Sequence, residues 1–344
     1  MGGKALSVKG VRMDKNTYDT IAATVLQAIG EVAPGVKADI IPAIFSKTDF
    51  GDIDVLLEAV TQARVEEIAQ ALQVQEVVRN GTVVSLGLPQ GKALVQVDLI
   101  QVPAADYEFA KNYFGFNDLG NLLGRVAHKA GFKMGHLGLR YVLRDDEDSS
   151  HVLQELVVTR DWDAALELLG YEAARYRAGQ RGGFQTLEDL FKYVISSPYA
   201  YKDMYLLENM SHAARTRDRK RPTYKAFLQW LERDELAMPE AWENVELVRT
   251  TLLQTALERF PDFREAYAQA VALNDLRKTA RAKFNGKLVA EITGTTGLEL
   301  GEVMRRIRSD FGGRAEFWQW VVDTDTEEIR QKVLESNQVS GVVI

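Results

Sequence analysis

Cysteine is absent from this 344-residue chain, and histidine is scarce, with only four residues. Disulfides, thiolate zinc sites and cysteine nucleophiles are therefore excluded, and a metal site built from several histidines is disfavoured. A metal ion in this protein is expected to have oxygen ligands. Proline is also rare, with eight residues, whereas the hydrophobic fraction of 46% and the charged fraction of 26% are ordinary for a globular protein.

Long apolar runs are missing as well. No stretch of about 18 apolar residues predicts a membrane-spanning helix, and residues 1–16 lack the apolar centre of a signal peptide. We therefore expect a cytoplasmic protein that does not bind a membrane. The formal net charge of −7 gives no sign of nucleic-acid binding over the chain as a whole.

Two segments are basic against this acidic background. Residues 275–314 contain nine basic and five acidic side chains, which predicts a local basic surface. Residues 215–222 read RTRDRKRP. This run predicts either a solvated loop or a contact with a phosphodiester backbone.

The spacing of apolar residues predicts an α+β first part of the chain. Residues 17–32 have helical spacing, and a second helix is expected around 61–73. β-like runs occupy 38–46, 52–60, 82–88 and 93–102. The last two runs flank a Pro-Gln-Gly-Lys turn that predicts a hairpin. A mixed or antiparallel sheet with helices beside it is expected.

The second part of the chain is predicted to be helical. A further hairpin is expected from 136–144 and 151–159, after which helical spacing recurs. The predicted helices are 161–170, 186–197, 222–235, 240–259, 262–283, 286–293, 298–311, 314–322 and 326–336. We expect an α+β domain over 1–160 and an all-helical domain over 161–344, with the boundary in 160–185.

Three aspartates are the main candidates for chemistry. In the string Gly51-Asp52-Ile53-Asp54-Val55, strand alternation places Asp52 and Asp54 on one face and the apolar residues on the other. Asp98 stands alone in the apolar run 93–102, where an unpaired carboxylate is costly. If the two strands are neighbours, Asp98 lies about 5 Å from the pair. Three carboxylates at that range could hold two Mg²⁺ or Mn²⁺ ions for phosphoryl or nucleotidyl transfer.

At these residues the chain resembles the polymerase β superfamily of nucleotidyltransferases, over about residues 17–102. The resemblance implies a mixed sheet with flanking helices, in which Asp52 and Asp54 are the metal pair. Asp98 matches the third carboxylate, which helps to deprotonate the acceptor hydroxyl. Ser46 matches the phosphate-binding serine, and Lys47 or Thr48 are alternatives for that role.

Further cations could hold the triphosphate. The glycine-punctuated segment 124–140 contains Lys133 and Arg140, and Arg140 is the preferred candidate because it lies in a β run. The alternative is that both are solvated surface residues.

A second resemblance covers the last helices. Phe284-Asn285-Gly286-Lys287-Leu288, followed by Gly297 and by Leu300-Gly301, resembles a helical segment of tRNA nucleotidyltransferases. The resemblance implies a helical body that holds tRNA, and here it coincides with the basic segment 275–314. Helix breaking by glycine explains the same pattern without RNA.

The sequence thus predicts a template-independent nucleotidyltransferase. It would transfer a nucleoside monophosphate from a nucleoside triphosphate to an acceptor hydroxyl, with RNA as the expected acceptor and pyrophosphate as the product. Two alternatives stay open. The acceptor could be a protein hydroxyl, or the domain could be a binding protein without activity, because Phe45 replaces the family's glycine and the turn before Asp52 is short.

Overall fold

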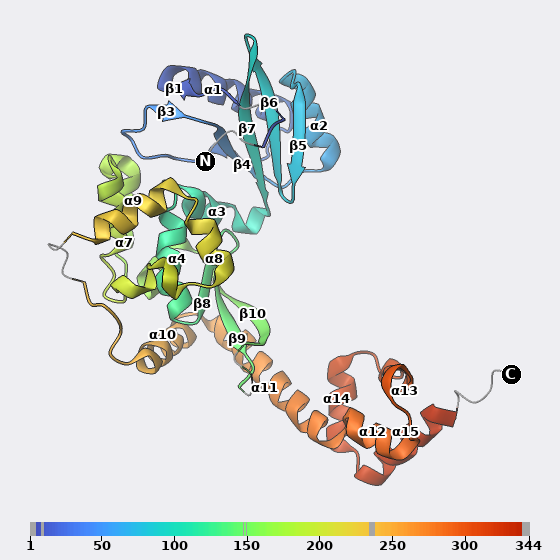
Figure 1. Cartoon of the computed structure of the whole chain (residues 1–344). Coiled ribbons are helices and arrows are strands. Elements are labelled where there is room, and N and C mark those ends of the chain that lie inside the picture. Colours follow the sequence, from blue (N-terminus) through green and yellow to red (C-terminus); the bar gives the residue numbers. More distant parts are fainter. Residues whose placement is uncertain (1–4, 8–9, 147, 149, 234–237, 339–344) are drawn as a thin grey trace. The chain divides into compact units, whose positions relative to one another are not determined.

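The computed structural model describes residues 5–7, 10–146, 148, 150–233 and 238–338. The chain is an α+β protein with a mixed sheet and many helices, as predicted (Figure 1). Its internal contacts divide it into two compact units, Met1–Phe263 and Arg264–Ile344. The boundary expected in 160–185 falls inside the first unit, where the helix that begins at Trp162 contacts elements on both sides of it in sequence. Within the described residues, no helix combines the length and the apolar content needed to cross a bilayer.

A five-stranded sheet positions the candidate site in the first unit. Its order is β2 (Ala38–Ile40), β4 (Ile53–Glu58), β7 (Ala93–Val102), β6 (Val83–Gln90) and β5 (Glu76–Asn80). β4 and β7 pair in parallel, and the other neighbours pair antiparallel, so the sheet is mixed. The predicted β6–β7 hairpin is confirmed. Its turn includes Gly91 at φ 62°, a left-handed conformation that favours glycine.

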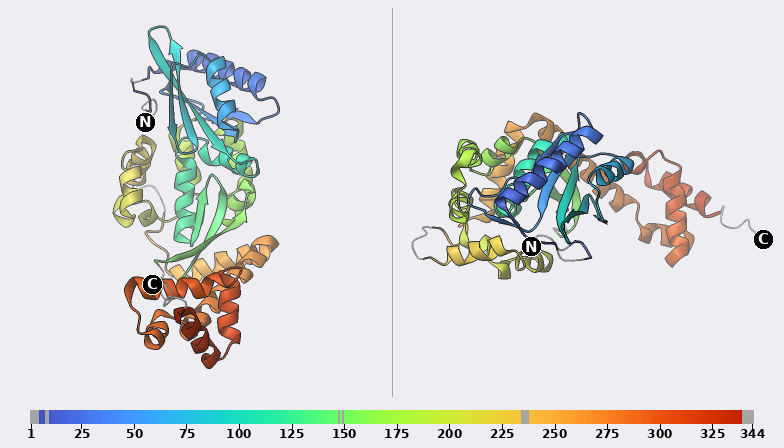
Figure 2. Two further views of the ribbon diagram at one scale, coloured as in Figure 1. Left: turned by 90° about the vertical axis from the view of Figure 1, so that its right-hand side faces the viewer. Right: turned by 90° about the horizontal axis from the view of Figure 1, so that it is seen from above.

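Two helices cover one face of this sheet. α1 (Lys15–Val32) and α2 (Gln62–Ala71) lie on the same side of the strands (Figure 2). Their buried residues form one core with alternate residues of the strands. Members of this core include Val25 and Ile29 of α1, Ile68 of α2, Ile53 and Val55 of β4, and Val97 and Leu99 of β7. The polar residues between them therefore face the opposite side.

The opposite face is covered only in part by α3 (Tyr107–Phe114). A small cluster joins Tyr107 and Ala110 of this helix to Leu56 of β4 and Val102 of β7. Leu56 follows Asp54 on the same face of β4 by strand alternation. The helix therefore covers the end of β4 that lies beyond its aspartates.

A second, three-stranded antiparallel sheet follows in the same unit. Its order is β10 (Val152–Thr159), β9 (Gly138–Arg144) and β8 (Phe132–Gly135), which confirms the second predicted hairpin. The helix α4 (Leu119–Lys129) precedes it and packs on β8. The remaining α-helices of the unit are α5 (Trp162–Leu168), α6 (Ala173–Ala178), α7 (Leu187–Val194), α8 (His212–Asp218), α9 (Pro222–Leu231) and α10 (Val245–Arg259).

The second unit is helical. It contains most of α11 (Pro261–Lys283), together with α12 (Gly286–Thr293), α13 (Gly297–Ser309), α14 (Arg314–Asp323) and α15 (Thr326–Gln338). Its apolar core includes Val289, Ile307, Val321 and Val333, each fully buried.

Several predictions about elements were wrong. The β run 38–46 ends at Ile40, because the chain then passes through Pro42, which has no N–H to donate, into a turn at Phe45-Ser46. The helix predicted from 240 begins at Val245, where the Asn244 side chain accepts a hydrogen bond from Leu247 N–H. Residues 234–235 of the predicted helix 222–235 lie outside the described residues. The helices α3 and α4 and the strands β5 and β8 were not predicted.

Candidate metal and nucleotide site

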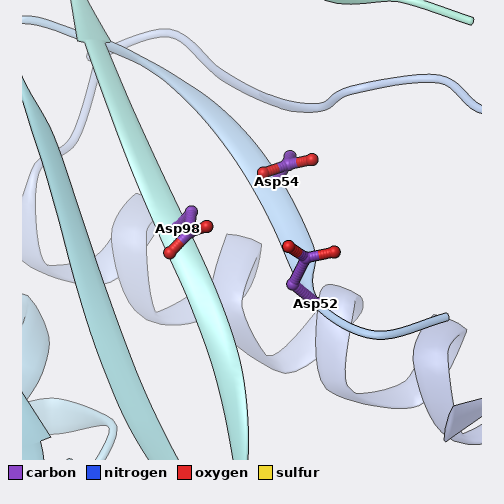
Figure 3. A group of neighbouring side chains, drawn as sticks. All are labelled: Asp52, Asp54 and Asp98. Carbon is purple, nitrogen blue, oxygen red and sulfur yellow. The ribbon is translucent and has the colours of Figure 1, made fainter. Parts of the chain in front are cut away.

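Asp52, Asp54 and Asp98, here called the carboxylate triad, converge on one face of the five-stranded sheet (Figure 3). Asp54 on β4 lies directly beside Asp98 on β7 in the parallel register. Asp52 immediately precedes β4. One oxygen atom from each residue lies within 4.8 Å of those of the other two. Carboxylates at this spacing could hold a metal ion.

The apolar residues around the aspartates fix their direction. Ile53 and Val55 are fully buried in the core under α1 and α2, which turns Asp54 to the other face. Phe50 of the short strand β3 (Asp49–Phe50) is also buried, and its ring stacks on Tyr18 of α1 at 4.0 Å between centroids. The turn that presents Asp52 is therefore held at its start by aromatic packing.

The negative charges of the triad repel one another. Burial raises the pKa of Asp54 to about 7, with further contributions from the negative charges of Asp52 and Asp98. Burial also raises the pKa of Asp98, although hydrogen bonds from Ser85 and Gln96 oppose this shift. Gln96 Nε2 donates to both carboxylate oxygens of Asp98, at 3.0 and 2.9 Å. A bound cation would relieve the repulsion that raises the pKa of Asp54.

A small pocket of about 90 Å³ adjoins two members of the triad. It is lined by Tyr18, Ile41, Pro42, Ala43, Lys47, Phe50, Asp52, Asp54, Phe114 and Asn117. Lys47 is the one cation in this lining, and its charge lowers the pKa of Asp54 against the larger effects of burial and repulsion. The Lys47 ammonium also lies 4.7 Å from the centroid of the Phe50 ring. The wall thus combines carboxylates for a cation with a lysine for an anion.

The other predicted phosphate-binding residues of this turn do not line the pocket. Ser46 and Thr48 are exposed. The backbone N–H groups of Phe45 and Ser46 donate to the carbonyls of Phe184 and Gln185, each at 3.0 Å. Two amides of the expected phosphate cradle are therefore already paired.

Lys133 and Arg140 lie on the second sheet and share one partner. Their side chains bind Glu155 of β10, with N–O distances of 2.7 and 2.6 Å. Neither residue lines the pocket beside the triad. On the same hairpin segment, the His136 ring stacks on Phe114, a pocket residue, at 5.4 Å between centroids.

The basic run 215–222 is neutralised in part by aspartates. Asp218 is fully buried and accepts hydrogen bonds from Arg125 and from Arg217. Arg221 pairs with Asp118. Two of the five basic side chains that favoured RNA contact in this segment thus form ion pairs inside the first unit.

The sequence did not predict that four further residues lie near the triad, namely Tyr18, Ser85, Gln96 and Asn117. Ser85 and Gln96 carried a usable signal, because polar residues at alternate positions of an apolar strand mark a polar face. Asn117, at φ 62°, lies in a loop whose position no local pattern predicts.

Comparison with known proteins adds no assignment: no protein-family model matches the chain, and no curated protein matches it.

Proposed function

We propose that this protein is a template-independent nucleotidyltransferase that uses a nucleoside triphosphate and an acceptor hydroxyl. The observation that supports the proposal is the meeting of three carboxylates within 4.8 Å of one another beside a pocket that also contains Lys47. All donors of the triad are carboxylate oxygens, which suit Mg²⁺ or Mn²⁺. The fit is supported further by the raised pKa of Asp54, since its causes include the charges of the other two aspartates.

The resemblance to the polymerase β superfamily assigns a role to each member of the triad, and the position of Lys47 in the pocket supports a role in phosphate binding. Asp52 and Asp54 would hold the divalent cations, with Asp98 as the third ligand. When bound, these cations neutralise phosphate charge and favour the ionised form of an attacking hydroxyl. Asp98 assists removal of the hydroxyl proton, and Lys47 binds the triphosphate. The acceptor oxygen forms a bond to the α-phosphorus, the bond from that phosphorus to the bridging oxygen breaks, and pyrophosphate leaves.

RNA is the proposed acceptor, through its 3′ hydroxyl. The support is the resemblance of residues 284–304 to tRNA nucleotidyltransferases, together with the basic excess of residues 275–314. In the structure, residues 284–304 span α12 and the first part of α13, and residues 275–314 also include the end of α11.

The test is transfer of label from each of the four α-labelled nucleoside triphosphates, with bulk RNA and Mg²⁺ or Mn²⁺. We expect labelled RNA from the natural chain. Asp54→Asn should lower the rate by at least about 100-fold, because one charged ligand of the cations is lost. Asp49→Asn is the matched control, since Asp49 is an exposed aspartate nearby that pairs with Arg12.

Three other results of the labelling experiment would change or overturn the proposal. Label on the protein alone would replace RNA by a protein acceptor. Full activity of the Asp54 variant would remove the triad from the reaction. Absence of any labelled product with every triphosphate and both cations would overturn the proposal.

A further inference from the structure

The second unit contains a pocket of about 400 Å³ that is far larger than the one beside the triad. Its lining residues come from α11, α13 and α14 and from the turns that flank them. The lining consists of Ala280, Arg281, Phe284, Arg308, Gly313, Arg314, Phe317 and Trp318. We call it the arginine pocket. Its volume is in the range that encloses small molecules in proteins.

The three arginines of this pocket have no acidic partner among the described residues. Arg281, Arg308 and Arg314 are exposed, and within the described part of the chain they form no ion pair. Neighbouring acids are engaged elsewhere, as Asp310 binds Lys332 at 2.5 Å and Glu316 accepts from Gly312 N–H at 2.9 Å. Guanidinium groups gathered on one surface repel one another, and an anion bound there would reduce that repulsion.

The guanidinium groups are close enough to affect one another. Burial lowers the pKa of Arg308, and the positive charges of Arg314 and Arg281 lower it further. The Arg308 guanidinium also lies 5.8 Å from the centroid of the Phe317 ring, a cation–π contact that holds it in the wall. An anion with several oxygen atoms, such as a phosphate group, would join all three cations.

Three aromatic side chains form most of the rest of the wall. Phe284 and Phe317 are buried and meet edge to face at 5.3 Å between ring centroids. Trp318 is half-buried and lines the same pocket. Indole rings and arginines together suit a ligand with a planar base and a phosphate, since bases stack on aromatic side chains.

We infer that the arginine pocket binds a phosphorylated nucleotide, with its phosphate on Arg281, Arg308 and Arg314 and its base against Trp318. The ligand could be a free nucleoside polyphosphate or the 5′-phosphorylated end of an RNA, which share this chemistry. The inference goes beyond the proposed function and does not depend on it, because the pocket contains no carboxylate for a divalent cation.

The experiment uses the full chain carrying Asp54→Asn, in EDTA, so that cation-dependent binding by the triad does not contribute. Tryptophan fluorescence and calorimetry follow titrations with ATP, inorganic pyrophosphate, adenosine, and short RNAs with a 5′ phosphate or a 5′ hydroxyl. We expect saturable binding of ATP or of the phosphorylated RNA, competition by pyrophosphate, and no comparable binding of adenosine. Whichever of ATP and the 5′-phosphorylated RNA binds more tightly shows whether the pocket takes a free nucleotide or an RNA end.

Single substitutions test whether the ligand binds in the arginine pocket. Arg308→Gln and, separately, Arg281→Gln should weaken binding by about ten-fold or more, because each removes one charge-assisted hydrogen bond. Arg305→Gln, an exposed arginine on the same helix outside the pocket, should change the affinity less than about two-fold. Trp318→Phe should retain binding and abolish the fluorescence change.

The inference is overturned if neither ATP nor the phosphorylated RNA binds in EDTA. It is also overturned if Arg305→Gln weakens binding as much as the two pocket variants, since binding would then reflect general charge. Arg281 and Arg308 are both exposed, so neither variant is expected to unfold the unit, and circular dichroism checks that each is folded. Absence of nucleotidyl transfer by the natural chain, together with this binding, would count against the proposed function alone.

Discussion

Asp54 is the residue on which the chemistry of the first unit depends most. It is the member of the triad that lies directly beside Asp98 in the sheet, and both burial and neighbouring charges raise its pKa to about 7. A buried carboxylate of this kind contributes little to stability. It is a good candidate for function, because side chains with strongly shifted pKa values concentrate at functional sites. Strand alternation in the sequence predicted the face of the sheet on which the Asp54 side chain lies. The extent of its burial depended on which strands became neighbours.

The raised pKa of Asp54 predicts a pH dependence of stability without divalent cations. Between its unfolded pKa of 3.8 and its folded pKa of about 7, only the folded state keeps the proton. The free energy of unfolding should therefore fall as pH rises through this window, by up to roughly 4 kcal/mol from this group. Above about pH 7 its contribution should level off.

The measurement is urea unfolding in EDTA at pH 5, 6, 7 and 8. Asp54→Asn should flatten the decrease, because the amide does not titrate, whereas Asp49→Asn should keep it. If the free energy of unfolding falls equally with pH in the natural chain and in the Asp54 variant, burial of Asp54 is not the cause of the decrease. Mn²⁺ affinity should change in the opposite direction and increase as pH rises toward 7, since the ligand must lose its proton.

At the scale of elements, β7 supports the triad through its polar face. Gln96 and Asp98 are separated by two positions and so share one side of the strand, opposite the core residues Val97 and Leu99. Ser85 of β6 lies beside Asp98 in the register. The strand thus buries apolar residues under the helices while it orients a carboxylate on the other face.

Gln96→Leu should weaken Mn²⁺ binding by roughly 10-fold and leave the fold unchanged, because residues that orient a metal ligand commonly have this effect. Calorimetric titration with Mn²⁺ measures the affinity, and circular dichroism checks the fold. Gln90→Leu, at the exposed end of β6, is the matched control. Unchanged affinity in the Gln96 variant would mean that Asp98 needs no such orientation or is not a ligand.

At the scale of the whole molecule, two units have separate cores. The first contains the triad and the second contains the arginine pocket, and the core of the second is built from its own helices. Ile307 lies fully buried in that core and does not line the pocket. The two sites are therefore expected to respond separately to changes in packing.

Ile307→Ala should destabilise the second unit by roughly 2–5 kcal/mol through the cavity that it leaves. Hydrogen exchange should accelerate in α12–α15 and remain unchanged in β4 and β7, because local stability follows local packing. Leu298→Ala is the control, since Leu298 is 90% exposed. Faster exchange in both units to the same extent would contradict separate cores.

The sequence by itself determined the local patterns. Alternation placed Asp52 and Asp54 on one face, helical spacing predicted most of the helices after residue 160, and turn residues predicted both hairpins. These features depend on neighbours within a few positions, so a sequence pattern contains them. The sequence could not determine which strands pair over long distances, because that pairing is decided by the packing of the whole core.

Tertiary structure decided three things. It placed β4 parallel to β7 and so brought Asp98 to the pair. It placed Lys133 and Arg140 in ion pairs with Glu155. It also brought Arg281, Arg308 and Arg314 to one pocket, where none of them pairs with an acid among the residues that the structure describes. The physical reason is common to all three: the energy of a charge depends on what lies beside it in space, and the chain's fold alone sets those neighbours.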